Sequence, residues 1–158
     1  VRARLPMFRD IRLLDASFDP SQALDRLSAA SPDAGGIASF VGKVRAGDGV
    51  EALELTHYEP LTLPGMEELA DQCFGRWTIN GLVMLHRIGL LGPGEPIVCV
   101  AAAACHRRDA IEAVDFAMDH LKSCAWFWKR EKRADSTGEG WQWIEPREAD
   151  YADLTRWK

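Results

Sequence analysis

The sequence has no apolar run that approaches the ~20 residues a helix needs to cross a bilayer. Residues 1–6 include two arginines but no apolar stretch behind them, which is not the pattern of a secretory signal. These two absences predict a protein of the cytosol with no membrane partner.

Metal-binding and nucleophile motifs are also missing. The four cysteines, expected to be reduced thiols in the cytosol, form no C-x-x-C pair, so no metal site is expected. Cys105 and His106 are neighbours, and adjacent side chains on a strand point to opposite faces, so a Cys–His pair is disfavoured. No Ser-His-Asp set is evident, and the turn over residues 92–96 lacks the Lys-Ser/Thr of a phosphate loop. Neither a cofactor nor a metal is therefore predicted.

A broad excess of positive charge is lacking too, since the 158-residue chain has a net charge of −5. General nucleic-acid binding needs a wide basic surface, so it is disfavoured. The hydrophobic fraction of 47% and charged fraction of 27% are typical of an ordinary globular protein. The length predicts one domain over residues 1–158.

What the sequence does contain is one basic stretch among aromatic residues. Residues 122–133 carry a local net charge of +4, and the aromatics Trp126, Phe127 and Trp128 lie inside this stretch. Apolar neighbours raise the cost of keeping a lysine charged. The stretch therefore predicts a site that binds an anion or uses a lysine chemically.

Residues 106–123 are predicted to form a helix that ends at this stretch. At about 100° per residue, an apolar stripe contains Ile111, Val114, Met118 and Leu121, and Arg107 lies on it. Lys122 falls at the edge of the stripe and is expected to be half-buried at the last turn. It is either a snorkelling lysine that favours the helix C-terminus or a site residue.

The next predicted strand, residues 126–133, has two different faces. Alternation groups Phe127, Lys129, Glu131 and Arg133 on one face, and Trp128, Arg130 and Lys132 on the other. The alternatives are a solvated charge ladder and a site in which Lys129 works beside Glu131.

The remaining elements are assigned from periodicity and turn residues. Helices are predicted at 21–30 and 66–77, and strands at 37–44, 50–58, 82–88, 97–104 and 141–145. Residues 1–20 are an edge or lead-in segment, and 59–65, 89–96 and 134–140 are loops or turns. Strands 37–44 and 50–58 are expected to pair as a hairpin. The mixed order indicates an α+β fold with a hairpin at each end.

Several single residues allow two interpretations. Arg45 follows a strand of small residues and is either exposed or close to a ligand. His106 starts a helix as a cap or as a site residue. His57 and His86 are expected to be structural, and Trp141 and Trp143 to be core residues.

Ordered motifs then point to a family. They are Phe40–Arg45 (FVGKVR), Leu85–Gly89 (LHRIG), Ala104–Arg107 (ACHR), Met118–Lys122 (MDHLK), Phe127–Glu131 (FWKRE) and Trp143–Glu148 (WIEPRE). In this order and spacing the chain resembles the large, catalytic subunit of molybdopterin synthase, from about Gly35 to Arg147. The lead-in before residue 30 matches weakly.

The resemblance implies an α+β fold of the α/β-hammerhead type, with a mixed antiparallel sheet, two main helices and hairpins. It implies a central homodimer that binds a small ubiquitin-like subunit at each end, as a heterotetramer. That subunit would end in Gly-Gly and carry a C-terminal thiocarboxylate. The implied reaction is the transfer of two sulfurs to cyclic pyranopterin monophosphate, which yields molybdopterin.

The resemblance also implies residue roles. Lys122 and Lys129 match catalytic lysines, with Lys122 placed where the partner's terminal glycine arrives and able to move a proton if its pKa is lowered. Positions expected to bind the substrate are Phe40, Arg45, His106, Arg107, Met118, Glu131 and Arg147.

Two departures from the family pattern are evident. Trp126 stands where the family often has proline, and the segment 59–65 looks longer than in close relatives. A competing interpretation is a non-catalytic RNA- or nucleotide-binding module that stacks bases on the aromatics near Trp126. A different acyl or phosphoryl transferase is disfavoured because no nucleophile or metal cluster is evident.

Overall fold

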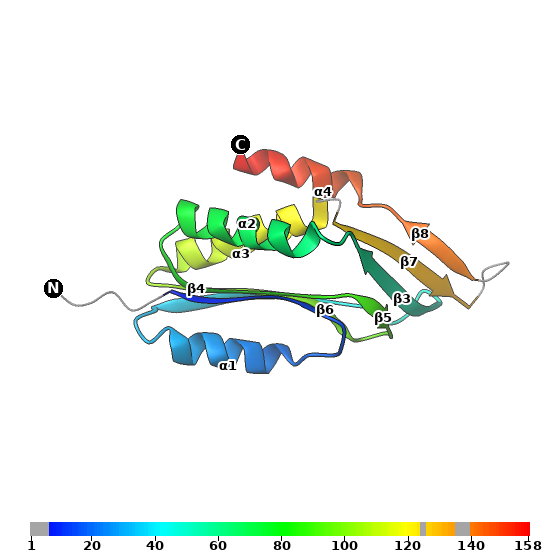
Figure 1. Cartoon of the computed structure of the whole chain (residues 1–158), viewed down its shortest axis with the longest axis horizontal. Coiled ribbons are helices and arrows are strands. Elements are labelled where there is room, and N and C mark those ends of the chain that lie inside the picture. The colour runs from blue at the N-terminus through cyan, green and yellow to red at the C-terminus, as the bar shows by residue number, and fades with distance from the viewer. Residues whose placement is uncertain (1–6, 124–125, 135–139) are drawn as a thin grey trace.

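The protein is built on a central four-stranded sheet covered on both faces by helices (Figure 1). The computed structural model describes residues 7–123, 126–134 and 140–158. The strands, in spatial order, are β1 (Phe8–Leu14), β4 (Ile79–Arg87), β6 (Pro96–Ala104) and β2 (Gly36–Lys43). β1 runs parallel to β4, whereas the β4–β6 and β6–β2 pairs are antiparallel.

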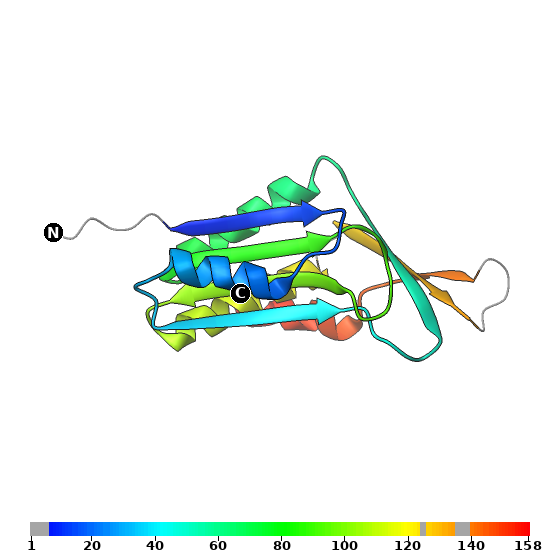
Figure 2. The same ribbon diagram turned by 90° about the horizontal axis from the view of Figure 1, so that it is seen from below.

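Alternation along the two central strands directs side chains to both helical layers. Val83 and Leu85 pack with Leu27 of α1 (Pro20–Ala30), which lies along the strands in Figure 2. Leu82 and Met84 face the other way, toward α2 (Thr62–Arg76) and α3 (Arg107–Ser123). Both faces of these strands are buried, which explains why their sequences are continuously apolar.

Local sequence explains where the helices begin. The side chain of Asp19 caps α1 by accepting the Ser21 N–H at 2.9 Å, and Pro20 occupies the first helical position. α2 begins at Thr62, four residues earlier than predicted, and Pro64 fits its first turn because the N–H that proline lacks has no helical partner there. The predicted loop at 59–65 is therefore wrong for 62–65.

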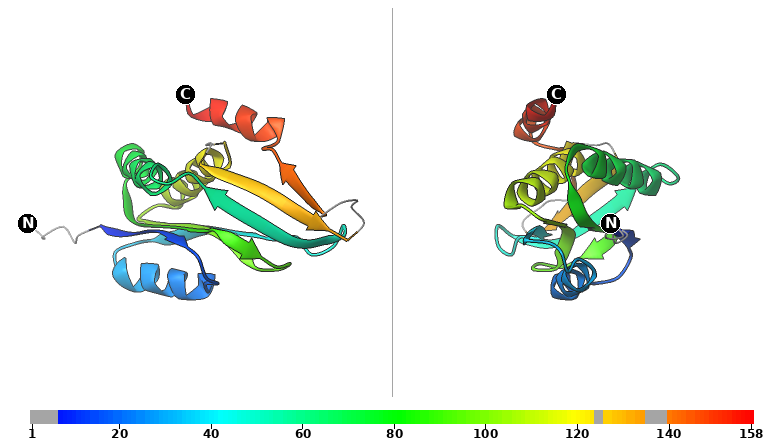
Figure 3. Two further views of the ribbon diagram at one scale, coloured as in Figure 1. Left: turned by 45° about the vertical axis from the view of Figure 1, so that its right-hand side comes forward. Right: turned by 90° about the vertical axis from the view of Figure 1, so that its left-hand side faces the viewer.

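A second four-stranded sheet slants away from the first (Figure 3). Its order is β5 (Gly89–Leu91), β3 (Val50–His57), β7 (Phe127–Arg133) and β8 (Trp141–Ile144), and all its pairs are antiparallel. The β7–β8 hairpin was predicted. The predicted hairpin of 37–44 with 50–58 is wrong, because β2 pairs with β6 and β3 pairs with β5 and β7.

The chain changes sheets between β2 and β3. The β2 register shifts between Gly42 and Lys43, and the Val44 N–H then bonds the Glu95 carbonyl at 3.0 Å. Residues 89–96, predicted as a turn, include strand β5 as well. Residues 135–139 of the predicted loop, the thiol of Cys124 and the lead-in residues 1–6 lie outside the described residues.

The C-terminal segment packs back onto the helical layer. It consists of α4 (Glu148–Asp153) and the 3₁₀ turn η1 (Leu154–Trp157), drawn red above α3 in Figure 1. The indole of Trp157 packs edge-on against Phe116 and Trp77, and its N–H donates to Asp119 at 2.6 Å. This docking fixes the chain after β8 close to the end of α3. Among the described helices, none has the length and apolarity needed to cross a membrane.

Candidate active site

Two adjoining hollows lie where the second sheet meets the end of α3. The first hollow has a volume of about 230 Å³ and the second about 290 Å³. Both are lined by Lys43, Ile97, Lys129, Ile144 and Arg147, so they form one continuous cleft. Strands of both sheets, α3 and the C-terminal segment converge here.

Lys129 is a lysine with a strongly lowered pKa in the cleft. Burial, and then the charge of Lys122, lower its pKa from 10.5 to about 8. Asp150 and Glu131 oppose the shift but do not cancel it. A part of the Lys129 population is therefore a neutral amine near pH 8.

Lys122 lies on the opposite wall of the first hollow, at the last turn of α3. It is exposed, not half-buried as predicted, and the lysine with the lowered pKa is Lys129. Met118 and Leu121 supply the apolar wall between Lys122 and the sheet. The first hollow therefore pairs one accessible ammonium with one partly neutral amine.

His86 lines the same hollow and was not predicted as a site residue. Its ring stacks on Phe127 with centroids 3.8 Å apart, and Nδ1 lies 2.8 Å from the Arg87 carbonyl oxygen. A carbonyl only accepts, so Nδ1 carries the proton and Nε2 is an acceptor. Burial, followed by the charges of Lys129 and Lys122, lowers the His86 pKa to about 3, so the ring stays neutral. Its structural role was predicted, but only the folded chain places it beside the lysines.

The C-terminal segment closes the cleft on one side. Arg147 donates to Asp150 at 3.1 Å from both its guanidinium and its backbone N–H. Burial alone would raise the pKa of Asp150, but these hydrogen bonds outweigh it and hold the pKa below its usual range. Ser123, at the end of α3, donates to the Asp150 carbonyl at 2.7 Å. Asp150, which sequence reasoning missed, thus connects Arg147 to the helix that carries Lys122.

The second hollow contains the predicted Arg45 and Glu131. Glu131 accepts from the Arg133 guanidinium at 3.1 Å, and on the other face of β7 Arg130 donates to Glu54 at 2.8 Å. The predicted alternation of β7 is confirmed, and both of its faces contain ion pairs. Lys129 differs from these arginines because it faces a cation.

Gly42 keeps space open at the junction of β2 with the cleft. A Cβ at this position would come 2.8 Å from Val98 Cγ1 and 3.4 Å from a ring carbon of Phe40. Gly42 lines the first hollow, whereas the half-exposed Phe40 lies beside it and lines neither hollow. A larger residue at 42 would fill the entrance from the β2 side.

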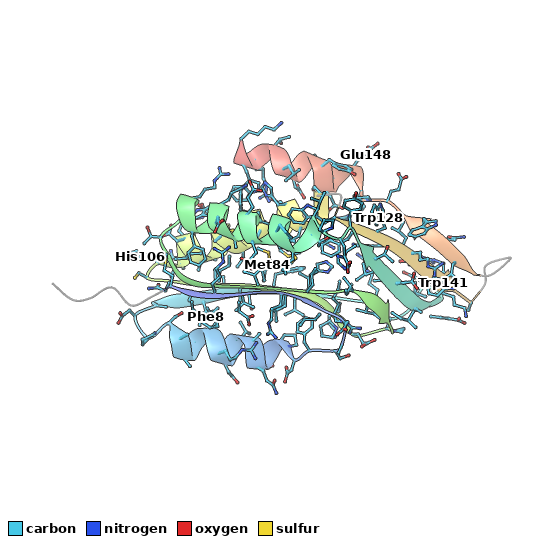
Figure 4. All side chains as sticks on the ribbon, in the orientation of Figure 1. Phe8, Met84, His106, Trp128, Trp141 and Glu148 are labelled. Atoms are coloured by element: carbon cyan, nitrogen blue, oxygen red, sulfur yellow. The ribbon has the colours of Figure 1, made fainter. Side chains whose placement is uncertain are left out.

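Two predicted residues, His106 and Arg107, lie far from the cleft. They begin α3, which carries Lys122 fifteen residues after Arg107; this separation is about 22 Å along a helix. Figure 4 shows His106 at the opposite end of the molecule from Trp128 and Glu148. Both residues are exposed, as is Ile111, so the predicted apolar stripe is wrong at Arg107 and Ile111. The buried face instead contains Ala110, Ala113 and Ala117, small residues that let α3 approach the sheet.

The two tryptophans of β8 are not core residues as predicted. Trp143 is 67% exposed, and Trp141 is only half-buried. The Arg130 guanidinium lies over both rings, 4.5 Å from the Trp141 centroid and 5.8 Å from that of Trp143. These are cation–π contacts on the face of β7 that points away from Lys129.

The arrangement suits anion binding combined with proton transfer. Lys43, Arg45, Lys122, Lys129 and Arg147 bring five cationic side chains to apolar walls. Cations gathered in this way bind phosphate and stabilise oxyanions. No group of three or more His, Cys, Asp or Glu that could hold a metal ion occurs within the described part of the chain.

Comparison with known proteins gives consistent results. The family model for "MoaE protein" matches residues 13–124. The molybdopterin synthase catalytic subunit of Pseudomonas aeruginosa is 42% identical over 151 residues, which cover 94% of this chain and 98% of the relative. The solved molybdopterin cofactor biosynthesis protein E from Burkholderia multivorans superimposes with a TM-score of 0.78 at 37% identity, covering 95% of this chain and 97% of that one. The fold is shared with a Helicobacter pylori complex of subunits 1 and 2 of molybdopterin-converting factor, at a TM-score of 0.69, 21% identity and coverage of 87% and 90%.

Proposed function

The chain belongs to the MoaE protein family, and we propose from this premise that its cleft is the active site of a molybdopterin synthase catalytic subunit. Such an enzyme is a sulfurtransferase of molybdenum cofactor biosynthesis. The observation that carries the assignment is the pairing of Lys122 with the partly neutral Lys129 in a cationic cleft.

The substrate is cyclic pyranopterin monophosphate, and the product is molybdopterin. The sulfurs come from a small ubiquitin-like subunit that carries its C-terminal Gly-Gly as a thiocarboxylate. A catalytic subunit implies such a partner, and an extended glycine tail is thin enough to enter a narrow cleft. The reaction belongs in the cytoplasm, where thiol chemistry is protected from oxidation.

Each cationic residue has a distinct task in this scheme. Lys122, exposed at the end of α3, meets the carbonyl carbon of the incoming tail. Lys129, with a pKa of about 8, exchanges protons with the pterin intermediate near neutral pH. Arg45 and Arg147 hold the substrate phosphate in the second hollow, where Glu131 fixes the β7 side. Met118 supplies an apolar wall of the first hollow.

His106, Arg107 and Phe40 line neither hollow of their own chain. His106 and Arg107 reach a substrate only if a second copy presents them, which supports a homodimer within a heterotetramer, whereas Phe40 already lies beside the first hollow. In that assembly the end of α3 opposite Lys122 would border the partner's cleft.

The competing RNA-binding hypothesis is weakened by the aromatic side chains. Its stacking platform was the group of aromatics around Trp126, but the Trp126 ring itself packs against the main core and Gly65. Trp128 is exposed on the face of β7 opposite Lys129, so bases stacked there would not meet the lysines.

The deciding experiment is reconstitution from purified components. The chain, the thiocarboxylated small subunit and cyclic pyranopterin monophosphate are combined, and molybdopterin is quantified after oxidation to its fluorescent derivative. Lys122→Ala is expected to abolish product, whereas Lys132→Ala, on the exposed face of β7, is expected to retain it. Normal product formation by Lys122→Ala would contradict the assigned role.

A further inference from the structure

The indole of Trp126 lies directly against the backbone of Gly65 in α2. A Cβ at residue 65 would come 2.4 Å from Cζ2 of the indole, 2.5 Å from Cε2 and 2.9 Å from Nε1. Real Cβ contacts do not become this short, so residue 65 must be glycine while the ring stays in place. The two departures from the family pattern, Trp126 and the segment 59–65, thus contact each other.

A second contact holds the same residue through its backbone. The carbonyl of Trp126 accepts the Tyr58 N–H at 3.0 Å, immediately before α2 begins. The Tyr58 ring packs edge-on against Trp128, with centroids 6.1 Å apart. Trp126 also packs against the main core cluster, which includes Met66 of α2. The ring and the backbone of Trp126 are therefore both fixed by the start of α2.

The position of Trp126 in the chain gives this contact a consequence. It follows Lys122 by four residues and precedes Lys129 by three, in the segment that joins α3 to β7. Both lysines belong to elements that this segment connects. A shift of Trp126 would change how α3 and β7 face each other across the first hollow.

We propose that Trp126 is a positioning residue, and that the contact of its indole with Gly65 fixes the separation of Lys122 and Lys129. The significance of that separation rests on the proposed function. The contact between Trp126 and Gly65 is a property of the fold, and its effect can be tested without any sulfur transfer.

The proton affinity of Lys129 reports the separation. Charged or titratable groups line the hollows with Lys129 or act on its pKa from several elements: Lys122 on α3, Asp150 on α4, Arg147 just before α4, Glu131 on β7, His86 on β4 and Lys43 on β2. Of these, Lys122 lies on the element whose link to β7 contains Trp126. If Lys122 moves away, the repulsion weakens and the pKa of Lys129 rises from about 8 toward 10.5.

The test compares two glycines of the same helix. Gly65→Ala forces the indole to move, whereas at Gly75 a Cβ would meet nothing within 4 Å. Lys129 is acetylated over a range of pH in the full-length variants, and the extent is measured by peptide mass spectrometry. Gly65→Ala is expected to raise the labelling midpoint by about half a pH unit or more, and Gly75→Ala to leave it at the wild-type value. In the reconstituted assay Gly65→Ala is expected to lose about tenfold or more in rate.

A double variant distinguishes a positioning effect of Trp126 from an unspecific disturbance of the fold. Trp126→Leu removes the indole atoms that meet residue 65, so Gly65→Ala should add little further change in that background. The proposal is overturned if Gly65→Ala and Gly75→Ala give the same Lys129 midpoint. Should Gly65→Ala fail to fold, Trp126→Leu alone must raise the midpoint, and an unchanged midpoint overturns the proposal. A wild-type chain that makes no molybdopterin would refute the proposed function and leave the labelling result valid.

Discussion

Lys129 of β7 and Lys122 of α3 line the same hollow, and the positive charge of Lys122 disfavours the protonated form of Lys129. Two ammonium groups close together repel each other, so the neutral form of one of the two amines is favoured. Burial makes Lys129 the group that gives up its proton more readily. The pair is thus held in a state that costs stability and supplies a proton acceptor close to neutral pH.

Replacing Lys129 should therefore stabilise the protein while it removes activity. The pKa of Lys129 is about 8 in the folded state and 10.5 without burial, so between these values the unfolded state binds more protons. The free energy of unfolding of the wild type accordingly rises with pH over this window. Lys129→Met does not pay the cost of burying a charged amine. Its free energy of unfolding should therefore exceed that of the wild type by about 1–2 kcal/mol at pH 7, allowing for partial solvent screening. Urea denaturation at pH 7 and 10 measures the gain, which should shrink at the higher pH.

Lys132→Met is the matched control, since Lys132 is exposed on the other face of the same strand. Its unfolding free energy should follow that of the wild type at both pH values. If the unfolding free energies of the two variants depend on pH in the same way, Lys129 does not have the lowered pKa.

Arg147→Ala should impair substrate binding without loss of stability. The guanidinium is 76% exposed, and an ion pair so exposed to solvent contributes little to stability. A charged contact to a phosphate is stronger, so the KM for the pterin substrate should rise about tenfold or more. Steady-state kinetics and thermal unfolding are compared with those of Arg26→Ala, an exposed arginine of α1 that also forms a surface ion pair. A lower kcat with an unchanged KM would assign Arg147 to the chemical step instead.

His86→Phe should make the free energy of unfolding depend less on pH in the acid range. Burial, followed by the Lys129 and Lys122 charges, lowers the pKa of His86 from 6.5 to about 3, so the unfolded state binds more protons between these values. The stability that the neutral ring provides is complete above pH 6.5 and is lost as the pH falls toward 3. Phenylalanine keeps the stack on Phe127 but does not titrate.

The measurement is the difference in unfolding free energy between pH 6.5 and 4.5. The wild type should lose on the order of 1–2 kcal/mol more than His86→Phe over this interval. His106→Gln, at an exposed position, should behave as the wild type does. If His86→Phe retains the full pH dependence, His86 is not the group that titrates.

Periodicity was sufficient for the elements whose buried faces are regular. The apolar spacing of Met66, Leu69 and Cys73 predicted α2, and the alternation on either side of Lys129 predicted β7. Pairing between strands was harder, because β2 and β3 are neighbours in sequence and join different sheets. The cause is a register shift at Gly42 and bonding of Val44 to the 94–95 turn, which depend on distant residues.

The sequence was sufficient to select several residues of the site, but not to predict how the fold places them relative to one another. Lys122 and Lys129 could be selected because they flank an aromatic stretch close in sequence. Asp150 and His86 were missed because each reaches the cleft only through tertiary packing. Which lysine has the lowered pKa also depends on burial, and no local pattern contains that information.

Asp119→Asn tests how firmly the C-terminal segment holds the cleft wall. Asp119 is buried and accepts from both the Arg156 guanidinium and the Trp157 indole N–H, at 2.6 Å for the indole. Asp115 accepts from the same arginine at 3.1 Å but is half exposed. Neutralising the buried carboxylate should cost about 1–3 kcal/mol of unfolding free energy, whereas Asp115→Asn should cost less than about 1 kcal/mol. Because Arg147 and Asp150 lie in the chain between β8 and this anchor, Asp119→Asn should also raise the KM for the pterin substrate, and Asp115→Asn should not. Equal effects of the two variants on stability and KM would mean that Asp119 does not anchor the segment.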